Sequence, residues 1–210
     1  MTSRSVPFRV GDVLAGRYRV ESVLGEGGMG VVLGTVDLRS AQRVAIKLMS
    51  EEARRDDALV LRFVREAQAA ACLRSAHVAR ILDCGTLEDG QPYLASEQLA
   101  GYDLRRVIAA RAVIDPSEAV GYLLQVCEGL AEAHAAGIVH RDLKPANLFL
   151  TTTAAGRPLV KILDFGICKL LEQSTQRSLT KANEVLGTPR YMSPEQLVST
   201  RDVDLRTDIW

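Results

Sequence analysis

A run of glycines near the N-terminus restricts the fold more than any other feature of the sequence. Residues 24–32 read LGEGGMGVV, in which Gly25, Gly27 and Gly30 match the pattern G-x-G-x-x-G. This pattern recurs in loops whose backbone N–H groups approach phosphate oxygens, and alone it is a weak signal.

A dinucleotide-binding turn needs a helix after the third glycine. Residues 31–36 (VVLGTV) instead carry β-branched side chains that favour a strand. A Walker loop is excluded because valine, not lysine, follows the third glycine. The glycines therefore predict the tip of a β-hairpin.

Hydrophobic patterning predicts a strand-rich first half and a helix-rich second half. Strands are expected at residues 18–24, 31–38, 43–49, 78–85 and 92–99. A single helix is expected over residues 51–74, because strong helix formers accumulate there and Leu61, Val64 and Ala67 fall at near-helical spacing.

The clearest helix signal begins at Asp115. Asp115 is an N-cap candidate, Pro116 suits the first helical position, Glu118 resembles the second half of a capping box, and Gly137 suits the stop. The positions expected to face the core are Val120, Leu123, Leu124, Cys127, Leu130, Ala131 and His134.

Composition excludes several classes of protein. Lys plus Arg and Asp plus Glu both number 26, so no net charge indicates nucleic acid or an acidic membrane surface as a partner. No signal sequence and no apolar run of membrane-spanning length is present, and we expect a cytoplasmic chain without a membrane segment. The spacing of Cys72, Cys84, Cys127 and Cys168 indicates buried free thiols rather than zinc ligands or disulfides.

Four further motifs follow the glycine hairpin in a fixed order. They are Val44-Ala45-Ile46-Lys47, then HRDLKPAN at residues 140–147, then DFG at residues 164–166, then Ser193-Pro194-Glu195. With the glycine hairpin and Val32, this set resembles the protein kinase family. The segments EGGMG, KPANLFL and YMSPEQ are most similar to those of eukaryotic-like serine/threonine kinases of bacteria.

The resemblance implies an α+β fold with two lobes. The expected organisation is a lead-in at residues 1–16, a small antiparallel β lobe with one helix at residues 17–99, and a mainly helical, incomplete lobe at residues 100–210. The activity it implies is transfer of the γ-phosphate of ATP to Ser/Thr hydroxyls of proteins, with Mg²⁺, or Mn²⁺ as an alternative ion.

The resemblance also implies roles for individual residues. Asp142 would orient or accept the proton of the attacking hydroxyl, and Lys144 would stabilise the transferred group. Lys47 would contact the α/β phosphates and pair with Glu66, and Thr188 would bridge Asp142 and Lys144. Asn147 and Asp164 would be the metal ligands.

Nucleotide-binding positions follow from the same resemblance. They are Leu24, Gly25, Gly27, Gly30, Val32, Ala45, Lys47, Glu97, Leu99 and Phe149. Two residues depart from the family pattern. Ser96 stands where a bulky residue is common, and Phe149 where Leu or Met is usual, so a pocket deeper at its back and flatter at its floor is expected.

Regulation is expected through the segment between Asp164 and Glu195. A phosphate on Ser178 or Thr180, added in trans by a second copy, would pair with Arg141. Such a reaction requires self-association, at least transiently.

The end of the sequence leaves alternatives open. The resemblance implies that Asp208 braces the HRD loop and that the family continues beyond Trp210, so we expect a catalytic domain truncated at its C-terminal end. An active Ser/Thr kinase and an inactive nucleotide-binding scaffold both remain. A dinucleotide oxidoreductase has no support beyond the glycines.

Overall fold

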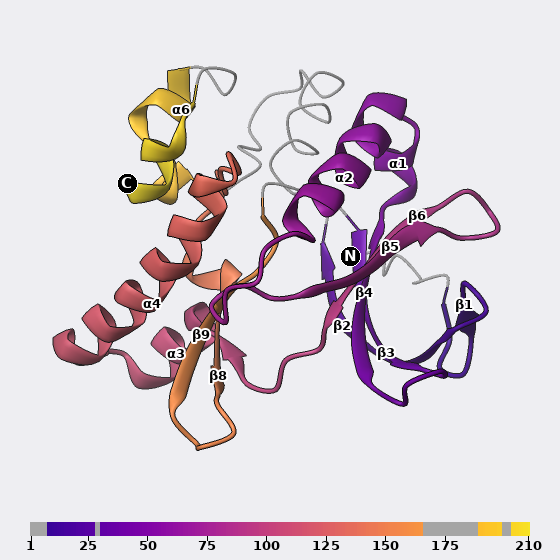
Figure 1. Ribbon diagram of the computed structural model, residues 1–210, viewed down its shortest axis with the longest axis horizontal. Helices are drawn as coiled ribbons and strands as arrows, with labels where there is room; N and C mark the ends of the chain where they lie inside the picture. Colours follow the sequence, from indigo (N-terminus) through magenta and orange to yellow (C-terminus); the bar gives the residue numbers. More distant parts are fainter. Residues whose placement is uncertain (1–7, 28–29, 166–188, 199–202) are drawn as a thin grey trace. The chain divides into compact units, whose positions relative to one another are not determined.

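Alternating side chains in the first half of the chain build a six-stranded antiparallel sheet (Figure 1). The structure is a computed structural model and describes residues 8–27, 30–165, 189–198 and 203–210. Its strands are β1 (Val13–Leu14), β2 (Tyr18–Gly27), β3 (Gly30–Asp37), β4 (Arg43–Met49), β5 (Ile81–Thr86) and β6 (Pro92–Glu97). Their order across the sheet is β1-β2-β3-β4-β6-β5. The five strands predicted from the sequence are confirmed, and β1 is an addition inside the predicted lead-in.

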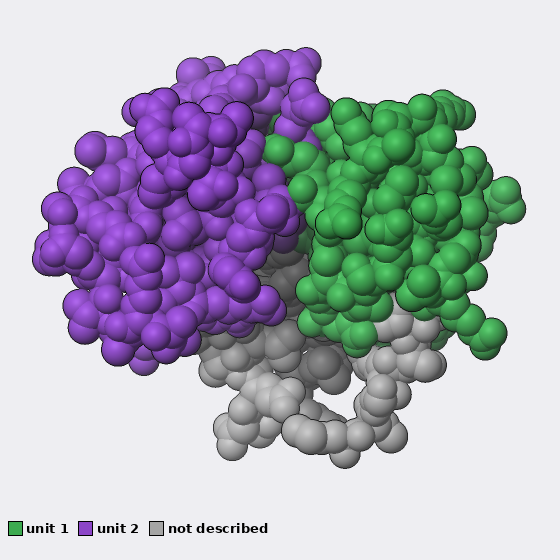
Figure 2. Space-filling view, turned by 90° about the horizontal axis from the view of Figure 1, so that it is seen from below, with its two compact units in different colours: residues 1–71, 81–98 green, residues 72–80, 99–210 purple. Residues whose placement is uncertain are grey.

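The chain divides into two units (Figure 2). The first comprises residues 1–71 and 81–98 and holds the six-stranded sheet. The second comprises residues 72–80 and 99–210. The chain therefore passes from one unit to the other three times.

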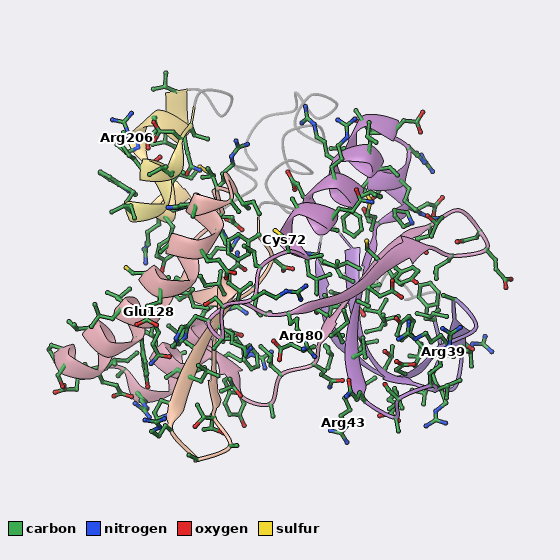
Figure 3. All side chains as sticks on the ribbon, in the orientation of Figure 1. Arg39, Arg43, Cys72, Arg80, Glu128 and Arg206 are labelled. Carbon is green, nitrogen blue, oxygen red and sulfur yellow. The ribbon has the colours of Figure 1, made fainter. Side chains whose placement is uncertain are left out.

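Residues 72–80 group with the second unit because they bind its longest helix and one of its strands. The carboxylate of Glu132 on α4 (Pro116–Ala135) accepts the backbone N–H groups of Arg74 and Ser75 at 2.8 and 2.6 Å. Val78 forms a parallel bridge to Ile162, the last residue of β9 (Pro158–Ile162). Figure 3 labels Cys72 and Arg80, at the two ends of this segment, and Glu128 on α4.

Period-two burial in β4 shows why the first unit folds around this strand. Val44, Ile46 and Leu48 are almost fully buried, whereas Ala45 and Lys47 between them are half-buried. The buried set points into one hydrophobic core, as alternating side chains of a strand must. That core consists of Leu14, Tyr18, Val20, Leu33, Val44, Ile46, Leu48, Tyr93 and Ala95.

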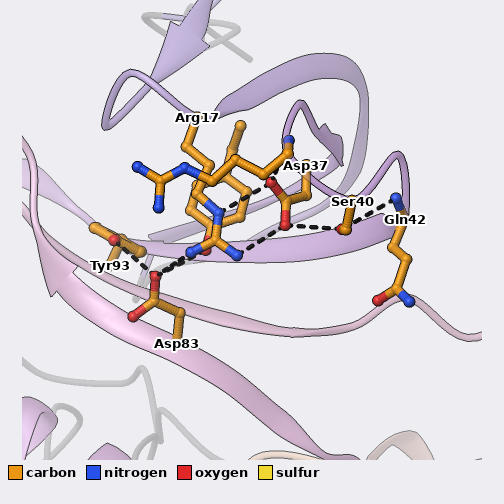
Figure 4. A network of polar contacts seen from close by, with 8 residues as sticks. Arg17, Asp37, Ser40, Gln42, Asp83 and Tyr93 are labelled. Atoms are coloured by element: carbon orange, nitrogen blue, oxygen red, sulfur yellow. Dashed lines mark hydrogen bonds and ion pairs between the residues drawn. The ribbon is translucent and has the colours of Figure 1, made fainter.

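A polar network joins β2, β3, β5 and β6 of the first unit (Figure 4). The guanidinium of Arg17 makes a two-pronged ion pair with Asp37 and also contacts Asp83 at 3.1 Å. The hydroxyls of Tyr18 and Tyr93 donate to the same Asp83 oxygen at 2.8 and 3.4 Å. Hydrogen bonding to Arg17 holds the pKa of Asp37 far below its ordinary value, and burial raises the pKa of Tyr18. The network therefore keeps Asp37 charged and Tyr18 neutral across the physiological pH range.

The single helix predicted over residues 51–74 is wrong, because two helices occupy this region. They are α1 (Glu51–Arg54) and α2 (Asp57–Ala70). The break occurs at Asp56, whose extended backbone and carboxylate cap the N–H groups of Ala58 and Leu59. The buried face of α2 consists of Leu59, Phe63, Ala67 and Ala70, so the predicted inner position Leu61 is half exposed instead.

Helix α4 begins and ends where the sequence predicts. The Asp115 carboxylate accepts the N–H groups of Ser117 and Glu118, Pro116 is the first helical residue, and Gly137 has a φ of +74° beyond the last turn. The second half of the capping box is not formed. The Glu118 carboxylate binds Arg111, at the end of α3 (Leu104–Arg111), instead.

The predicted core face of α4 is wrong at most positions. Val120, Leu123 and Leu124 are 54%, 57% and 60% exposed, and Cys127 and Ala131 are exposed as well. The residues that α4 buries are Tyr122, Val126, Gly129, Leu130 and Ala133. This face packs against β9, the third strand of a small antiparallel sheet formed by β7 (Tyr102–Asp103), β8 (Leu148–Thr152) and β9.

Candidate functional site

The register of the first sheet gathers several predicted nucleotide-binding residues on one face. Val32 pairs with Gly25 on one side and with Lys47 on the other. Ala45, two residues before Lys47, pairs with Ser96. Residues paired across strands and residues two apart along a strand share a face. Val32, Ala45, Lys47 and Ser96 therefore lie on the face opposite the buried Leu33 and Ile46.

Gly30 is the most constrained glycine of the hairpin. Its φ is +150°, and a Cβ atom at this position would lie 1.9 Å from the carbonyl oxygen of Leu48. Gly25 and Gly27 have no such neighbour within 4 Å. The third glycine is therefore required by the close approach of β3 to β4, beside Lys47.

The other predicted positions of the first unit are placed as follows. Glu66 lies on α2 and is half-buried, and Glu97 ends β6, paired with Val44. Leu24 in β2 is 43% exposed. In the second unit, Leu99 and Phe149 are half-buried, and Phe149 lies in β8.

Three predicted catalytic and metal-binding side chains meet in the loop that follows α4. The ammonium of Lys144 lies 2.8 Å from Oδ2 of Asp142. The side-chain amide of Asn147, in the short 3₁₀ turn η1 (Pro145–Asn147), donates to Oδ2 and to the backbone carbonyl of Asp142 at 2.9 and 2.8 Å. One carboxylate is thus held by a positive charge and an amide donor in a half-buried site.

The donor set of this loop fits a magnesium-type cation. Because Nδ2 of Asn147 donates to Asp142, its amide oxygen is the side-chain atom suited to a metal. Leu163, the neighbour of Asp164, donates its N–H to the Asn147 carbonyl at 2.9 Å, so Asn147 and Asp164 are close in space. Hard oxygen ligands of this kind suit Mg²⁺, which proteins hold through one or two carboxylates together with substrate phosphates.

The described ranges contain no cluster of three or more His, Cys, Asp or Glu side chains arranged to hold a metal. A cysteine- or histidine-based metal site is therefore not seen in this part of the chain. The predicted burial of the thiols is wrong for Cys72 and Cys127, which are exposed. Cys168 lies outside the described residues.

His140 joins the HRDLKPAN loop at residues 140–147, the candidate catalytic loop, to the DFG motif. Its Nε2 contacts the carbonyl of Leu163 at 2.9 Å, and its Nδ1 faces the N–H of Asp142 at 3.2 Å. A carbonyl only accepts and an N–H only donates, so the ring is neutral with its proton on Nε2. Complete burial lowers the pKa of His140 and favours the same state. The ring also packs on the buried Phe165, with centroids 5.0 Å apart.

Asp208 braces the loop from η3 (Leu205–Ile209), as the resemblance implies. Its carboxylate accepts the backbone N–H groups of His140 and Arg141 at 2.8 and 2.7 Å. It also accepts Nε2 of His134 at 2.8 Å. The role of His134 is not visible in the sequence, where it reads as one apolar-face position of a helix.

Several predicted residues lie outside the described part of the chain. These are Thr188, Ser178 and Thr180, together with Gly166 of the DFG motif. Arg141 is described and half-buried, with a φ of +66°.

Comparison with known proteins gives one consistent family. The protein kinase domain matches residues 18–210. The chain is 39% identical to the serine/threonine-protein kinase Pkn3 of Myxococcus xanthus over 202 residues, and 38% identical to a probable serine/threonine-protein kinase PknB of Corynebacterium glutamicum over 201 residues. These alignments cover 96% and 94% of this chain but 37% and 30% of the relatives, so the chain spans about a third of their length.

Solved structures agree with the sequence comparison. The kinase domain of PknI from Mycobacterium tuberculosis superposes with a TM-score of 0.75 at 30% identity, covering 96% of this chain and 72% of that one. The predicted α+β kinase fold is confirmed. In the part of the chain that the structure describes, none of the helices has the length and apolar character needed to cross a bilayer.

Proposed function

This chain belongs to the protein kinase family, and from that premise we propose that it transfers the γ-phosphate of ATP to serine and threonine hydroxyls of proteins. The observation that carries the proposal is the cluster of Asp142, Lys144 and Asn147 on one loop. Phosphoryl transfer asks the protein for positioning and charge stabilisation rather than covalent chemistry. A carboxylate, an ammonium group and an amide held together supply these functions.

Asp142 orients the attacking hydroxyl and accepts its proton. The amide of Asn147 fixes the carboxylate from one side, and Lys144 balances its charge. When a hydroxyl and a phosphoryl group occupy the site, the same ammonium group is within reach of the transferred charge. Lysine at this position also favours serine or threonine over tyrosine, in keeping with the names of the two relatives.

Most of the nucleotide contacts are assigned to residues of the first unit and the metal ligands to residues of the second. Lys47 would bind the α/β phosphates, with Glu66 as its partner, and Val32 and Ala45 would contact the adenine ring. Asn147 and Asp164 would hold Mg²⁺, which neutralises charge on the phosphates when bound. The small side chain of Ser96, paired with Ala45, would leave room at the back of the adenine site.

The activity is tested by incubating the chain with labelled ATP and a Ser/Thr-rich protein substrate. We expect Asp142→Asn to lower incorporation about 100-fold or more, because it removes the proton acceptor. Asp204→Asn is the matched control, since Asp204 is exposed and its carboxylate forms an ion pair with the neighbouring Arg206. Incorporation by the unaltered chain no greater than that of Asp142→Asn would favour a nucleotide-binding scaffold instead.

Regulation and location form the finer part of the proposal. Phosphorylation of Ser178 or Thr180 in trans, by a second copy in the cytoplasm, would introduce a dianion for Arg141 to bind. Mass spectrometry of the same reaction products decides this point. Full activity without phosphate between residues 170 and 185 would contradict it.

A further inference from the structure

A buried glutamine that directly follows the Ser193-Pro194-Glu195 motif contacts the loop at residues 140–147. Gln196 lies on α6 (Pro194–Val198) and is 5% exposed. Its Nε2 donates to the backbone carbonyl of Arg141 at 2.8 Å. This bond joins two segments that lie 55 residues apart in the sequence.

The orientation of the Gln196 amide is fixed by its second contact. Its Oε1 accepts the backbone N–H of Ser193 at 3.2 Å, so Nε2 must be the group that faces Arg141. The Ser193 hydroxyl lies 2.6 Å from the Thr207 hydroxyl. Thr207 directly precedes Asp208, so one small cluster connects Gln196 to the residue that braces His140 and Arg141.

Arg141 is held on both sides of a strained backbone. Its φ of +66° is one that residues with a side chain rarely adopt and that costs of order 1–3 kcal/mol. Asp208 binds its N–H and Gln196 binds its carbonyl. Strain of this kind persists only where surrounding contacts impose it.

The carbonyl of Arg141 and the N–H of Asp142 belong to one planar peptide unit. Gln196 fixes the oxygen end of this plane, and Nδ1 of His140 accepts from its N–H end at 3.2 Å. The plane leads directly to the Cα atom of Asp142. Rotation of the plane would therefore swing the Asp142 carboxylate away from Lys144 and Asn147.

We propose that Gln196 is a positioning residue for phosphoryl transfer, which sets the orientation of Asp142 through the Arg141 carbonyl. The inference rests on the proposed kinase function. Among the described residues, the Gln196 amide binds Arg141 and Ser193 rather than a reacting group. Its loss should therefore act on the rate of the chemical step rather than on nucleotide affinity.

The chain offers a matched control for this hydrogen bond. Gln91 is also 5% exposed, and its Nε2 donates to the Met49 carbonyl at 2.9 Å in the first unit. Gln91→Leu and Gln196→Leu each remove one buried amide-to-carbonyl bond. Gln196→Leu also removes the acceptor of the Ser193 N–H, so its loss of stability should be somewhat larger. Only the Gln196 bond reaches the catalytic loop.

Steady-state kinetics give the first readout. We expect Gln196→Leu to lower kcat about 10- to 100-fold with KM for ATP nearly unchanged, as for a displaced catalytic group, and Gln91→Leu to change kcat about threefold at most. Equal kcat values for the two variants would overturn the proposal.

Gln196→Glu adds a pH signature that a purely structural role would not produce. Its carboxylate faces the Arg141 carbonyl and repels it, whereas the protonated acid donates an O–H to the same oxygen. We expect kcat of Gln196→Glu, relative to the unaltered chain, to rise as the pH is lowered. A ratio independent of pH would contradict the role of this bond.

Hydrogen exchange of residues 139–148 gives a readout that does not need activity. We expect faster exchange in Gln196→Leu than in Gln91→Leu, because the Arg141–Asp142 peptide is released. If the unaltered chain is no more active than Asp142→Asn, the proposed function fails. Hydrogen exchange alone then tests whether Gln196 positions the Arg141–Asp142 peptide. Equal exchange in the two leucine variants would overturn the positioning role.

Discussion

At the scale of single residues, His140 combines three functions in one neutral ring. It donates to the Leu163 carbonyl, accepts from the Asp142 N–H and packs on Phe165. The contact with Asp142 requires Nδ1 to remain unprotonated, and the ring is fully buried. Protonation would place a donor against the Asp142 N–H and a charge in the core, so His140 makes the catalytic loop sensitive to acid.

The pH dependence of stability follows from burial of His140. Burial lowers its pKa below the ordinary 6.5, although the hydrogen bond to the Leu163 carbonyl and the charges of Asp208, Asp142 and Asp164 partly oppose the shift. Below pH 6.5 the unfolded chain binds the proton more readily, so stability should fall as the pH falls and be unaffected by this group at higher pH. One proton contributes at most about 1.4 kcal/mol per pH unit.

Denaturant unfolding at several pH values tests this expectation. His140→Gln retains a donor for the Leu163 carbonyl and cannot titrate, so its unfolding free energy should depend less steeply on pH under acidic conditions. The unaltered chain should be more stable at neutral pH, and this advantage should shrink on acidification. Parallel pH curves for the two proteins would contradict the assignment.

At the scale of elements, the glycine hairpin depends on backbone contact between β3 and β4. Gly30 pairs with Met49, two positions after Lys47 along β4, and closes against the Leu48 carbonyl. The tip of the hairpin is therefore coupled to the strand that carries the lysine.

Gly30→Ala and Gly27→Ala separate this contact from the general flexibility of glycine. We expect Gly30→Ala to destabilise the first unit by about 2 kcal/mol or more, because its methyl group collides with backbone and its φ is strained. Gly27 has open space at its Cβ position and no positive φ, so Gly27→Ala should stay within about 1 kcal/mol. Thermal unfolding measures both, and equal losses would contradict the steric argument.

Sequence patterns located elements where a signal is local. The alternation of side chains along residues 43–49 predicted β4, and the N-cap residue Asp115 predicted the start of α4. The buried face of α4 could not be predicted, because apolar residues occupy more than one side of this helix. The break at Asp56 could not be predicted, because an acidic residue suits either the first turn of a helix or its N-cap.

In the candidate site, too, residues in local motifs could be predicted and residues that act through tertiary contacts could not. Motifs identified Asp142, Lys144 and Asn147, which the structure brings together. His134 and Gln196 were missed because they act on a carboxylate and a carbonyl far away in the sequence. Such contacts depend on tertiary placement and leave no periodic pattern.

At the scale of the whole molecule, residues 72–80 are the part of the chain that leaves one unit and returns to it. Two backbone N–H groups of this segment share the Glu132 carboxylate, and His77 contacts both the Val160 carbonyl and Glu128. The path between α2 and β5 is therefore anchored in the second unit.

Glu132→Gln tests this anchor against Glu128→Gln. Glu132 accepts two backbone donors, so its replacement should cost about 1–2 kcal/mol, or roughly 2–8 °C in Tm for a chain of this size. Glu128 is 71% exposed, and its replacement should change Tm by no more than about 1 °C. Calorimetry of both variants gives the answer, and equal shifts would contradict an anchoring role for Glu132.

The bracing of the catalytic loop also has a consequence for biosynthesis. His140 and Arg141 are bound by Asp208, 68 and 67 residues later, and Arg141 by Gln196, 55 residues later. A ribosome completes residues 140–142 long before it delivers these partners. We expect the nascent polypeptide to remain without a formed loop until residue 208 has emerged, so that translation itself delays the folding of residues 140–142.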